Sequence, residues 1–185
     1  MMVKITDGFQ LSASVDLSVL DRIPIMDHPY GDSQPSNDVF RWMTYYNANG
    51  EIGFARNLGT FMPEVAECVV SFLSRCMEGS FDPHRVNFMR TRGSIDAHTD
   101  EGGRRCCINI GIRDSDAAIT RTSNDNRYET FSTCHTDHVV EVGSVYLLDV
   151  SRIHSVVALD SRERLLITYG FGATASQVLS RVKKM

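Results

Sequence analysis

The sequence predicts a mainly β protein, a double-stranded β-helix (jelly roll) with one or two flanking helices. The first observation is a series of short apolar segments, separated by turn residues, that fills the chain from Pro83 to Gly172. The second is a single amphipathic helical segment ahead of that series. The third is a His-Thr-Asp tripeptide whose partner histidine comes 56 residues later (154 − 98), an excursion that suits the return between the sheets of a jelly roll.

The 185 residues are expected to form a single domain, residues 1–185. We divide it into N-terminal strands, loops and a supporting helix (1–82), a jelly-roll core (83–172) and a C-terminal helix (173–185). The N-terminal part is predicted to hold short strands and a hairpin at Asn49-Gly50.

The helix is predicted over residues 62–79, with Pro63 in its first turn and Gly79 as its stop. Its apolar residues recur at helical spacing and are Val65, Val69, Phe72 and Cys76. We expect it to lie on the outside of a sheet. Core strands are predicted over 85–92, 94–100, 104–112, 116–123, 127–134, 138–143, 144–151, 154–159 and 162–172, with a last helix over 174–185.

The tripeptide His-Thr-Asp occurs twice, at residues 98–100 and 135–137. Side chains two residues apart share one face of a strand, so each copy offers an imidazole and a carboxylate to a divalent metal. A mononuclear non-heme Fe(II) site needs one further histidine, with the opposite side of the ion left open.

We expect the first copy to hold the metal, through His98 and Asp100, with His154 as the third ligand. The 56 residues between the two histidines leave room for about five or six short strands. His135 is only 19 residues (154 − 135) from His154, which suits a meander, so the second copy is expected at an exposed loop or strand end. The alternative is that His98 is an ordinary polar residue on a half-exposed strand.

Arg164 opens a strand whose alternation points it toward the interior together with Thr168. A guanidinium there needs an anion, and its planar fork suits a carboxylate, to which Thr168 is placed to donate as well. The opposite face of this strand is apolar and is expected to pack against helices. That face consists of Leu165, Ile167, Tyr169 and Phe171.

Residues 105–112 alternate in the same way, with Ile108, Ile110 and Ile112 as the apolar back. Arg105, Cys107 and Asn109 are then expected to face the interior, where the Asn109 amide needs hydrogen-bond partners. On the preceding strand Asn87, Met89 and Thr91 share a face. For Asn87 and Asn109 a purely structural bridging role is the alternative.

These segments resemble the Fe(II)/2-oxoglutarate-dependent oxygenases over residues 85–171, roughly the C-terminal half. The resemblance is carried by "MRTRGSIDAHTD", "RRCCINIGI" and "VEVGSVYLLDVSRIHSVVALDSRERLLITYGF". Within that superfamily the chain is most similar to the aspartyl/asparaginyl β-hydroxylase and cis-proline hydroxylase branch. The positions that match the pattern of that branch are Gly93, Arg105, Asn109, Gly143, Asp149, His154, Val156 and Arg164.

The resemblance implies Fe(II) held by His98, Asp100 and His154, and the C5 carboxylate of 2-oxoglutarate held by Arg164. It also implies cosubstrate contacts from Asn109, Asn87 and Met89. The implied activity is that of a dioxygenase, which hydroxylates an amino-acid or peptidyl C–H bond while 2-oxoglutarate is decarboxylated to succinate. Ascorbate is the reductant expected in vitro.

Two departures separate this chain from the aspartyl β-hydroxylases proper. Those enzymes lack the carboxylate ligand that Asp100 provides here, and they carry a basic His and Arg where this chain has Asn109 and Cys107. The N-terminal half, which usually shapes the substrate pocket, matches no pattern of the family.

Two alternatives are kept: a cupin-like metal-binding protein without oxygenase activity, and a nucleic-acid demethylase of the same fold. The first would have no reason to point Arg164 inward. The second would favour a basic face. The chain has 19 Lys and Arg against 23 Asp and Glu, a net charge of −4, and no Lys/Arg block. That balance disfavours a polyanion and favours a small amino acid or a peptide as substrate.

No run of 18 apolar residues and no signal-peptide core is present, so we expect a cytoplasmic protein without a membrane partner. Five cysteines without disulfide or zinc spacing indicate free thiols, with Cys106 and Cys107 on opposite faces of a strand.

The loops at 28–38 and 113–129 are expected to form the rim and lid of the site, since binding residues concentrate on loops. Four arginines are either ligands of an anionic substrate or ordinary surface residues: Arg104, Arg113, Arg121 and Arg127.

Overall fold

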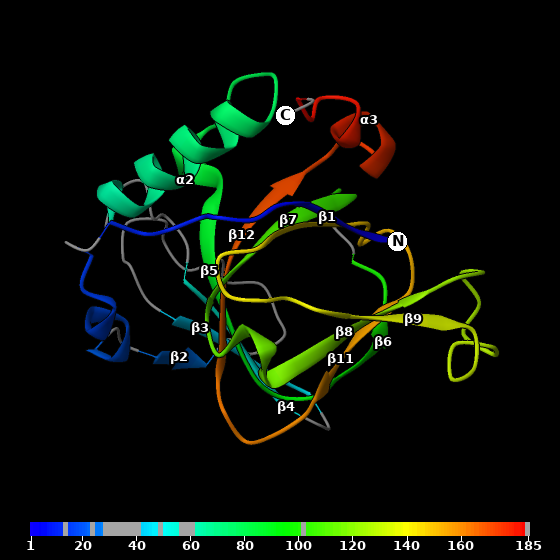
Figure 1. The fold of residues 1–185 in the computed structure, drawn as a ribbon. Coiled ribbons are helices and arrows are strands. Elements are labelled where there is room, and N and C mark those ends of the chain that lie inside the picture. The colour runs from blue at the N-terminus through cyan, green and yellow to red at the C-terminus, as the bar shows by residue number, and fades with distance from the viewer. Residues whose placement is uncertain are drawn as a thin grey trace.

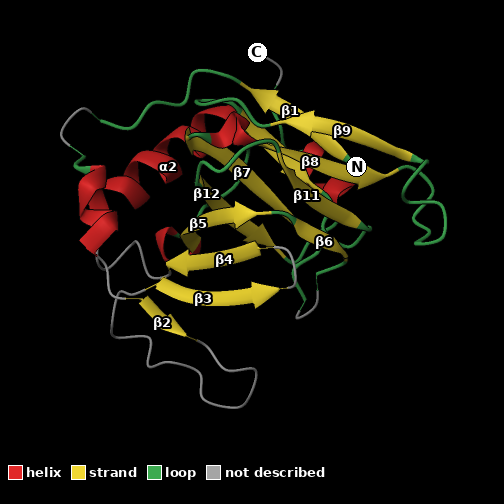
Figure 2. Cartoon of the chain, turned by 90° about the horizontal axis from the view of Figure 1, so that it is seen from below, coloured by secondary structure: helices red, strands yellow, loops and turns green. Residues whose placement is uncertain are grey.

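The computed structural model describes residues 1–12, 15–22, 25–27, 42–47, 50–55, 62–100 and 103–183, and most of its strands lie in two facing β-sheets (Figures 1 and 2). The larger sheet contains, in spatial order, β1 (Met2–Thr6), β10 (Val145–Leu148), β7 (Cys106–Arg113), β12 (Arg164–Phe171), β5 (Val86–Gly93), β4 (Gly50–Ala55), β3 (Trp42–Asn47) and β2 (Ile25–Asp27). The smaller sheet contains β6 (Ile95–His98), β11 (His154–Ala158), β8 (Ala118–Ser123) and β9 (His135–Val139).

The strands from β5 to β12 have the topology of a double-stranded β-helix. The chain alternates between the two sheets at every step except β8 to β9, which are neighbours in the smaller sheet, and every pairing among these strands is antiparallel. The predicted fold class is therefore confirmed. The N-terminal strands extend the larger sheet at both edges, because β1 pairs with β10 and β4 pairs with β5.

The helix α2 (Pro63–Cys76) covers the outer face of the larger sheet (Figure 1). It begins at Pro63, as expected, and ends at Cys76, three residues before Gly79. The outer core lies between this helix and the sheet. Its helical members are Val65, Ala66, Val69, Phe72, Leu73 and Cys76, and the strands add Val86, Phe88, Cys106, Ile108, Ile110, Val145, Leu147, Leu165, Ile167, Tyr169 and Phe171.

Alternation along β7 and β12 divides their side chains between two cores, as predicted. Ile108, Ile167 and Cys106 belong to the outer core, whereas Cys107 and Leu166 belong to a smaller inner core between the two sheets. Met2, Val140, Tyr146, Leu148 and Val150 complete that inner core. The inner faces of the strands therefore line the interior of the jelly roll.

The segment 127–134 differs from the prediction, because it forms turns and not a strand. The Asp125 carboxylate accepts hydrogen bonds from the Thr130 hydroxyl and the Arg127 N–H, and Asn126 adopts a left-handed backbone with φ of 61°. Such local side-chain bonds compete with a strand ladder. The following strand, β9, consequently begins at His135 and not at His138.

The shorter elements are three 3-10 helices and the helix α3 (Ala175–Leu179), much shorter than the helix expected over 174–185. The 3-10 helices are η1 (Leu17–Arg22), η2 (Pro83–Arg85) and η3 (Ser115–Ala117). The expected hairpin appears as the antiparallel pair β3 and β4, with Asn47 opposite Gly50. The predicted rim loop at 28–38 lies outside the described residues. Among the described residues, no helix combines the length and hydrophobicity needed to span a bilayer.

Candidate metal centre and adjoining pocket

Strand pairing brings His98 and His154 together, although 56 residues separate them (154 − 98). His98 ends β6, His154 begins β11, and the two residues are directly opposite in the antiparallel register of the smaller sheet. Asp100 follows two residues after His98, and its backbone N–H donates to the Val150 carbonyl at 2.9 Å. The predicted triad therefore assembles from a cross-strand pair and the loop that leaves one of its strands.

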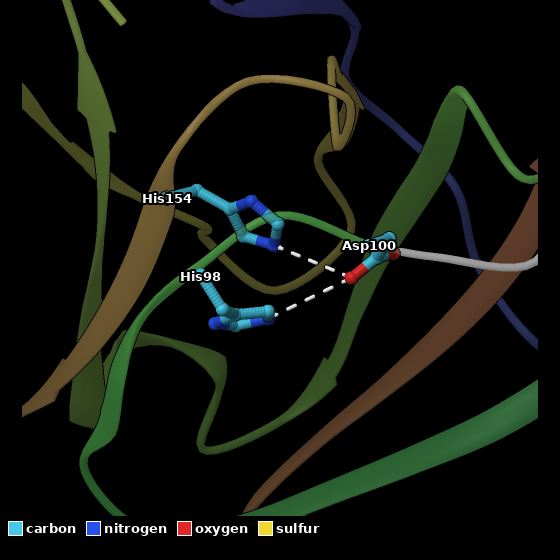
Figure 3. A group of neighbouring side chains, drawn as sticks. All are labelled: His98, Asp100 and His154. Atoms are coloured by element: carbon cyan, nitrogen blue, oxygen red, sulfur yellow. Dashed lines mark ion pairs between the residues drawn. The ribbon is translucent and has the colours of Figure 1, made fainter. Parts of the chain in front are cut away.

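The three side chains point toward one another (Figure 3). The Oδ1 oxygen of Asp100 lies 3.6 Å from Nε2 of His98 and 3.8 Å from Nε2 of His154. The two imidazole rings are 4.3 Å apart between centroids. One ligand atom from each residue fits within a group whose members all lie within 4.8 Å of one another, the arrangement that a metal ion would need.

Local hydrogen bonds select the tautomer of both histidines. Nδ1 of His98 lies 2.7 Å from the Asp96 carbonyl, and Nδ1 of His154 lies 2.9 Å from the Arg152 carbonyl. Because a carbonyl can only accept, each Nδ1 carries the proton and each Nε2 keeps its lone pair. Those lone pairs face Asp100, as in metal sites where a second-shell acceptor orients the imidazole.

Burial keeps His154 neutral. The residue is 6% exposed, and this burial, followed by the proximity of His98, lowers the pKa of His154 to about 4. A neutral imidazole is the form that binds a metal. His98 is more open, with 40% of its side chain exposed, so the site is closed on one side and accessible on the other.

The second His-Thr-Asp copy has different surroundings. Nε2 of His135 lies 3.6 Å from Asp137, but both Asp137 oxygens accept hydrogen bonds from the Arg121 guanidinium at 2.8 and 3.2 Å. Its strand, β9, is the outermost strand of the smaller sheet. Within the described part of the chain, no third metal-binding side chain joins this pair, so only the first copy assembles a three-ligand group.

Arg164 extends from β12 into the interior, as its alternation predicted. The residue is 2% exposed, and its Nη1 donates to the Thr120 hydroxyl at 3.2 Å, across to β8 of the other sheet. Its Nε has no hydrogen-bond partner among the described residues. Burial lowers the pKa of Arg164 to about 10, and the group remains cationic at neutral pH. A buried cation with an unused donor is suited to an anionic ligand.

One pocket joins the triad to Arg164. Of the predicted cosubstrate contacts, Asn109, Thr168 and Met89 line it, but Asn87 does not. Its amide donates instead to the Arg85 carbonyl at 3.0 Å. The other lining residues are Ile95, Arg104, Cys107, Thr120, Leu148, Val150 and Val156.

Thr120 and Arg104 are the polar lining residues that sequence reasoning did not assign to this site. Thr120 had a readable signal, since it alternates with the outward Arg121 on β8. The four arginines considered for an anionic substrate have separate positions. Arg104 contacts Asp100, Arg121 pairs with Asp137, Arg113 lies 3.8 Å from Glu163, and Arg127 is exposed. Arg105, expected in the interior, is exposed and does not line the pocket.

A part of the predicted lid holds the backbone next to His154. The side-chain oxygen of Asn126 accepts a hydrogen bond from the Ile153 N–H at 2.8 Å, and the Arg152 guanidinium donates to the Asn124 carbonyl at 2.9 Å. Ser123 N–H donates to the Ile153 carbonyl at 2.9 Å. The loop that follows β8 therefore supports a candidate metal ligand. The rest of the predicted 113–129 lid is η3 and β8.

No protein-family model and no curated protein sequence matches the chain. Similar solved structures include an oxidoreductase of the 2OG-Fe(II) oxygenase family from Burkholderia pseudomallei, 13% identical over 70% of this chain and 71% of that chain, with a TM-score of 0.49. HygX from Streptomyces hygroscopicus, solved with nickel and 2-oxoglutarate, is 14% identical over 73% and 75%, with a TM-score of 0.44. A Pseudomonas putida prolyl-4-hydroxylase is 13% identical over 68% and 73%, with a TM-score of 0.40. Because one fold serves many activities, the function must be argued from the side chains of the site.

Proposed function

We propose that this protein is an Fe(II)- and 2-oxoglutarate-dependent dioxygenase with His98, Asp100 and His154 as its metal ligands. The donor set supports this proposal, since two imidazoles and one carboxylate are the ligands of non-heme Fe(II) oxygenases that keep open coordination positions. The neutral Nε2 atoms and the carboxylate oxygen already face one another at 3.6 and 3.8 Å.

Arg164 is the observation that carries the proposal beyond metal binding. A cupin-like protein that only holds a metal has no use for a guanidinium 2% exposed, with an unpaired Nε, in the pocket that also contains the triad. Burial of such a charge without an anion is unfavourable by several kcal/mol. A dicarboxylate that reaches from the metal to Arg164 would satisfy the guanidinium.

The residues present fit 2-oxoglutarate. Arg164 would hold its distal carboxylate, and the Thr168 hydroxyl and the Asn109 amide, 2% and 4% exposed, line the same pocket and would hydrogen-bond to it. Bound Fe(II) and 2-oxoglutarate supply the oxidising chemistry, in which O2 hydroxylates an unactivated C–H bond while the cosubstrate becomes succinate and CO2.

The chain's own contribution is binding, orientation and the exclusion of water. His98, Asp100 and His154 would place the ion at the junction of the two sheets, and Arg164 would orient the cosubstrate toward it. Apolar side chains form most of the remaining wall and keep the interior dry: Met89, Ile95, Leu148, Val150 and Val156. We further propose that the hydroxylated group belongs to an amino acid, free or in a peptide.

Isothermal titration of 2-oxoglutarate into the Mn(II)-loaded protein tests the function. We expect one binding site in the wild-type protein and at least a hundredfold weaker binding in Arg164→Ala, because a charge-assisted bidentate contact contributes roughly 3 kcal/mol. Arg162→Ala, which alters an exposed arginine on the same connection, is the matched control and should bind normally. Absence of binding to the Mn(II)-loaded wild-type protein would favour a metal-binding protein without oxygenase activity.

A further inference from the structure

Arg104 contacts the one oxygen of Asp100 that does not face the histidines. Its Nε donates to Oδ2 at 2.9 Å, and its Nη2 forms an ion pair with the same oxygen. Oδ1 is the atom that lies 3.6 and 3.8 Å from the two imidazoles. The two oxygens of this carboxylate therefore have separate partners, a guanidinium on one side and the candidate metal position on the other.

Gly170 makes room for this contact. A Cβ at Gly170 would lie 2.9 Å from Cδ and 3.4 Å from Cγ of Arg104, closer than a packed side chain tolerates. The aliphatic part of Arg104 thus lies against the bare backbone of β12, and its guanidinium reaches Asp100 from there. Two positions distant in sequence, Arg104 and Gly170, together determine where the Asp100 carboxylate is held.

We propose that Arg104 is a positioning residue for the metal centre. By holding Oδ2, it makes Asp100 present Oδ1 alone to the ion, and it prevents the carboxylate from turning to offer both oxygens. A single-oxygen contact would leave more of the ion's coordination positions for cosubstrate and O2. This inference rests on the proposed function, because it assigns Arg104 a role toward the same metal.

Two effects of Arg104 on metal affinity oppose each other. Its positive charge repels a divalent cation nearby, so its removal favours binding. Its hydrogen bonds hold a ligand that is 12% exposed in the required orientation, so its removal also disfavours binding. Loss of a hydrogen-bonding partner of a metal ligand typically lowers metal affinity 10- to 100-fold, and we expect that effect to be the larger one.

Titration of Mn(II) into the protein, followed by the electron paramagnetic resonance signal of free Mn(II), tests this inference. We expect Arg104→Ala to weaken Mn(II) binding roughly tenfold or more. Arg104→Lys keeps the charge but not the planar fork, and should recover only part of the loss. Arg105→Ala removes the exposed neighbouring arginine and should bind Mn(II) as the wild type does.

Gly170→Ala is the second, independent variant. It keeps the charge of Arg104 but pushes its stem off β12, so it should also weaken Mn(II) binding several-fold, while thermal unfolding of the metal-free protein shows that the fold persists. Wild-type affinity in Arg104→Ala, or in a folded Gly170→Ala, would overturn the role of Arg104 and leave the metal centre standing. A wild-type protein that binds no Mn(II) would instead overturn the proposed function and, with it, this inference.

Discussion

The two His-Thr-Asp copies show how much single side chains outside a motif decide. Asp100 faces two imidazoles through one oxygen, because His154 is its neighbour across the strand pair β6 and β11. Asp137 has both oxygens bound by Arg121. Identical tripeptides therefore differ in metal-binding capacity through one partner each, a histidine in the first case and an arginine in the second.

Substitutions in the two copies should consequently have opposite effects. We expect His98→Ala or Asp100→Ala to abolish Fe(II) binding and succinate production with a cooperative unfolding transition retained. His135→Ala and Asp137→Ala should leave both nearly unchanged, and loss of the partly exposed Asp137 ion pair should reduce stability by less than about 1 kcal/mol. Metal analysis of the purified variants and a succinate assay are the measurements. An iron-loaded His98→Ala next to an iron-free His135→Ala would reverse the assignment.

Residues on regular strands were predictable from sequence, and residues on loops were not. Alternation alone placed Arg164 and Thr168 in the interior, since every second side chain of a strand shares a face. Arg104 precedes β7, where no period applies, and its direction depends on a loop of positive-φ backbone at Gly103, with φ of 82°. Its only signal in the sequence is indirect, namely the glycine at position 170 on a distant strand.

Strand β7 exposes adjacent cysteines to both layers of the protein, as the strand period predicted. Cys106 packs in the outer core at 0% exposure and Cys107 in the inner core at 3%. Burial raises the pKa of Cys106 to about 12 and that of Cys107 to about 11, against 9.0 for a free thiol. Both thiols therefore stay protonated in the folded protein at a pH where the unfolded chain has begun to lose its thiol protons.

The sign of the resulting pH dependence follows from these raised values. The contribution of each thiol to stability is complete below pH 9 and is lost as the pH rises from 9 toward the folded-state pKa. Between pH 8 and 10.5, Cys107 should account for a fall of about 2 kcal/mol in the free energy of unfolding. Urea denaturation under reducing conditions measures it. Cys107→Ala should show a shallower fall than the wild type, and an unchanged slope would contradict the assignment.

Element boundaries failed where side chains bind their own backbone. The turns at 127–134 replace an expected strand because Asp125 gathers local donors. At the C-terminus the Thr174–Gln177 capping box starts α3 as a helix-start pattern would predict, but the helix ends at Leu179. There the chain turns back toward α2, with Glu78 N–H donating to the Arg181 carbonyl and an isolated bridge between Met77 and Val182. These tertiary contacts have no sequence period.

At the scale of the whole molecule, charge is the main guide to the substrate. A net charge of −4 opposes the approach of a polyanion, whereas an amino acid or short peptide requires only local contacts. Within the described residues, the two arginines that line the pocket already have roles, Arg104 toward Asp100 and Arg164 toward the cosubstrate.

We therefore expect hydroxylation, read as a 16 Da mass gain, on a member of an amino-acid and peptide panel, in the presence of Fe(II), 2-oxoglutarate and ascorbate. Single-stranded oligonucleotides serve as the comparison set and should stay unmodified. Boiled protein and omission of 2-oxoglutarate are the controls. Demethylation confined to the oligonucleotides would replace the amino-acid assignment with the nucleic-acid alternative.

The pairing of β1 with β10 has a consequence for the order in which the fold can assemble. Met2 lies opposite Leu148, 146 residues later in the chain (148 − 2), and Met2 also belongs to the inner core. During synthesis at roughly 5–20 residues per second, the first strand emerges about 7–30 seconds before its partner exists. The earliest part of the polypeptide is thus among the last to become native, and the interior of the jelly roll stays open at that edge until translation has passed the sixth core strand.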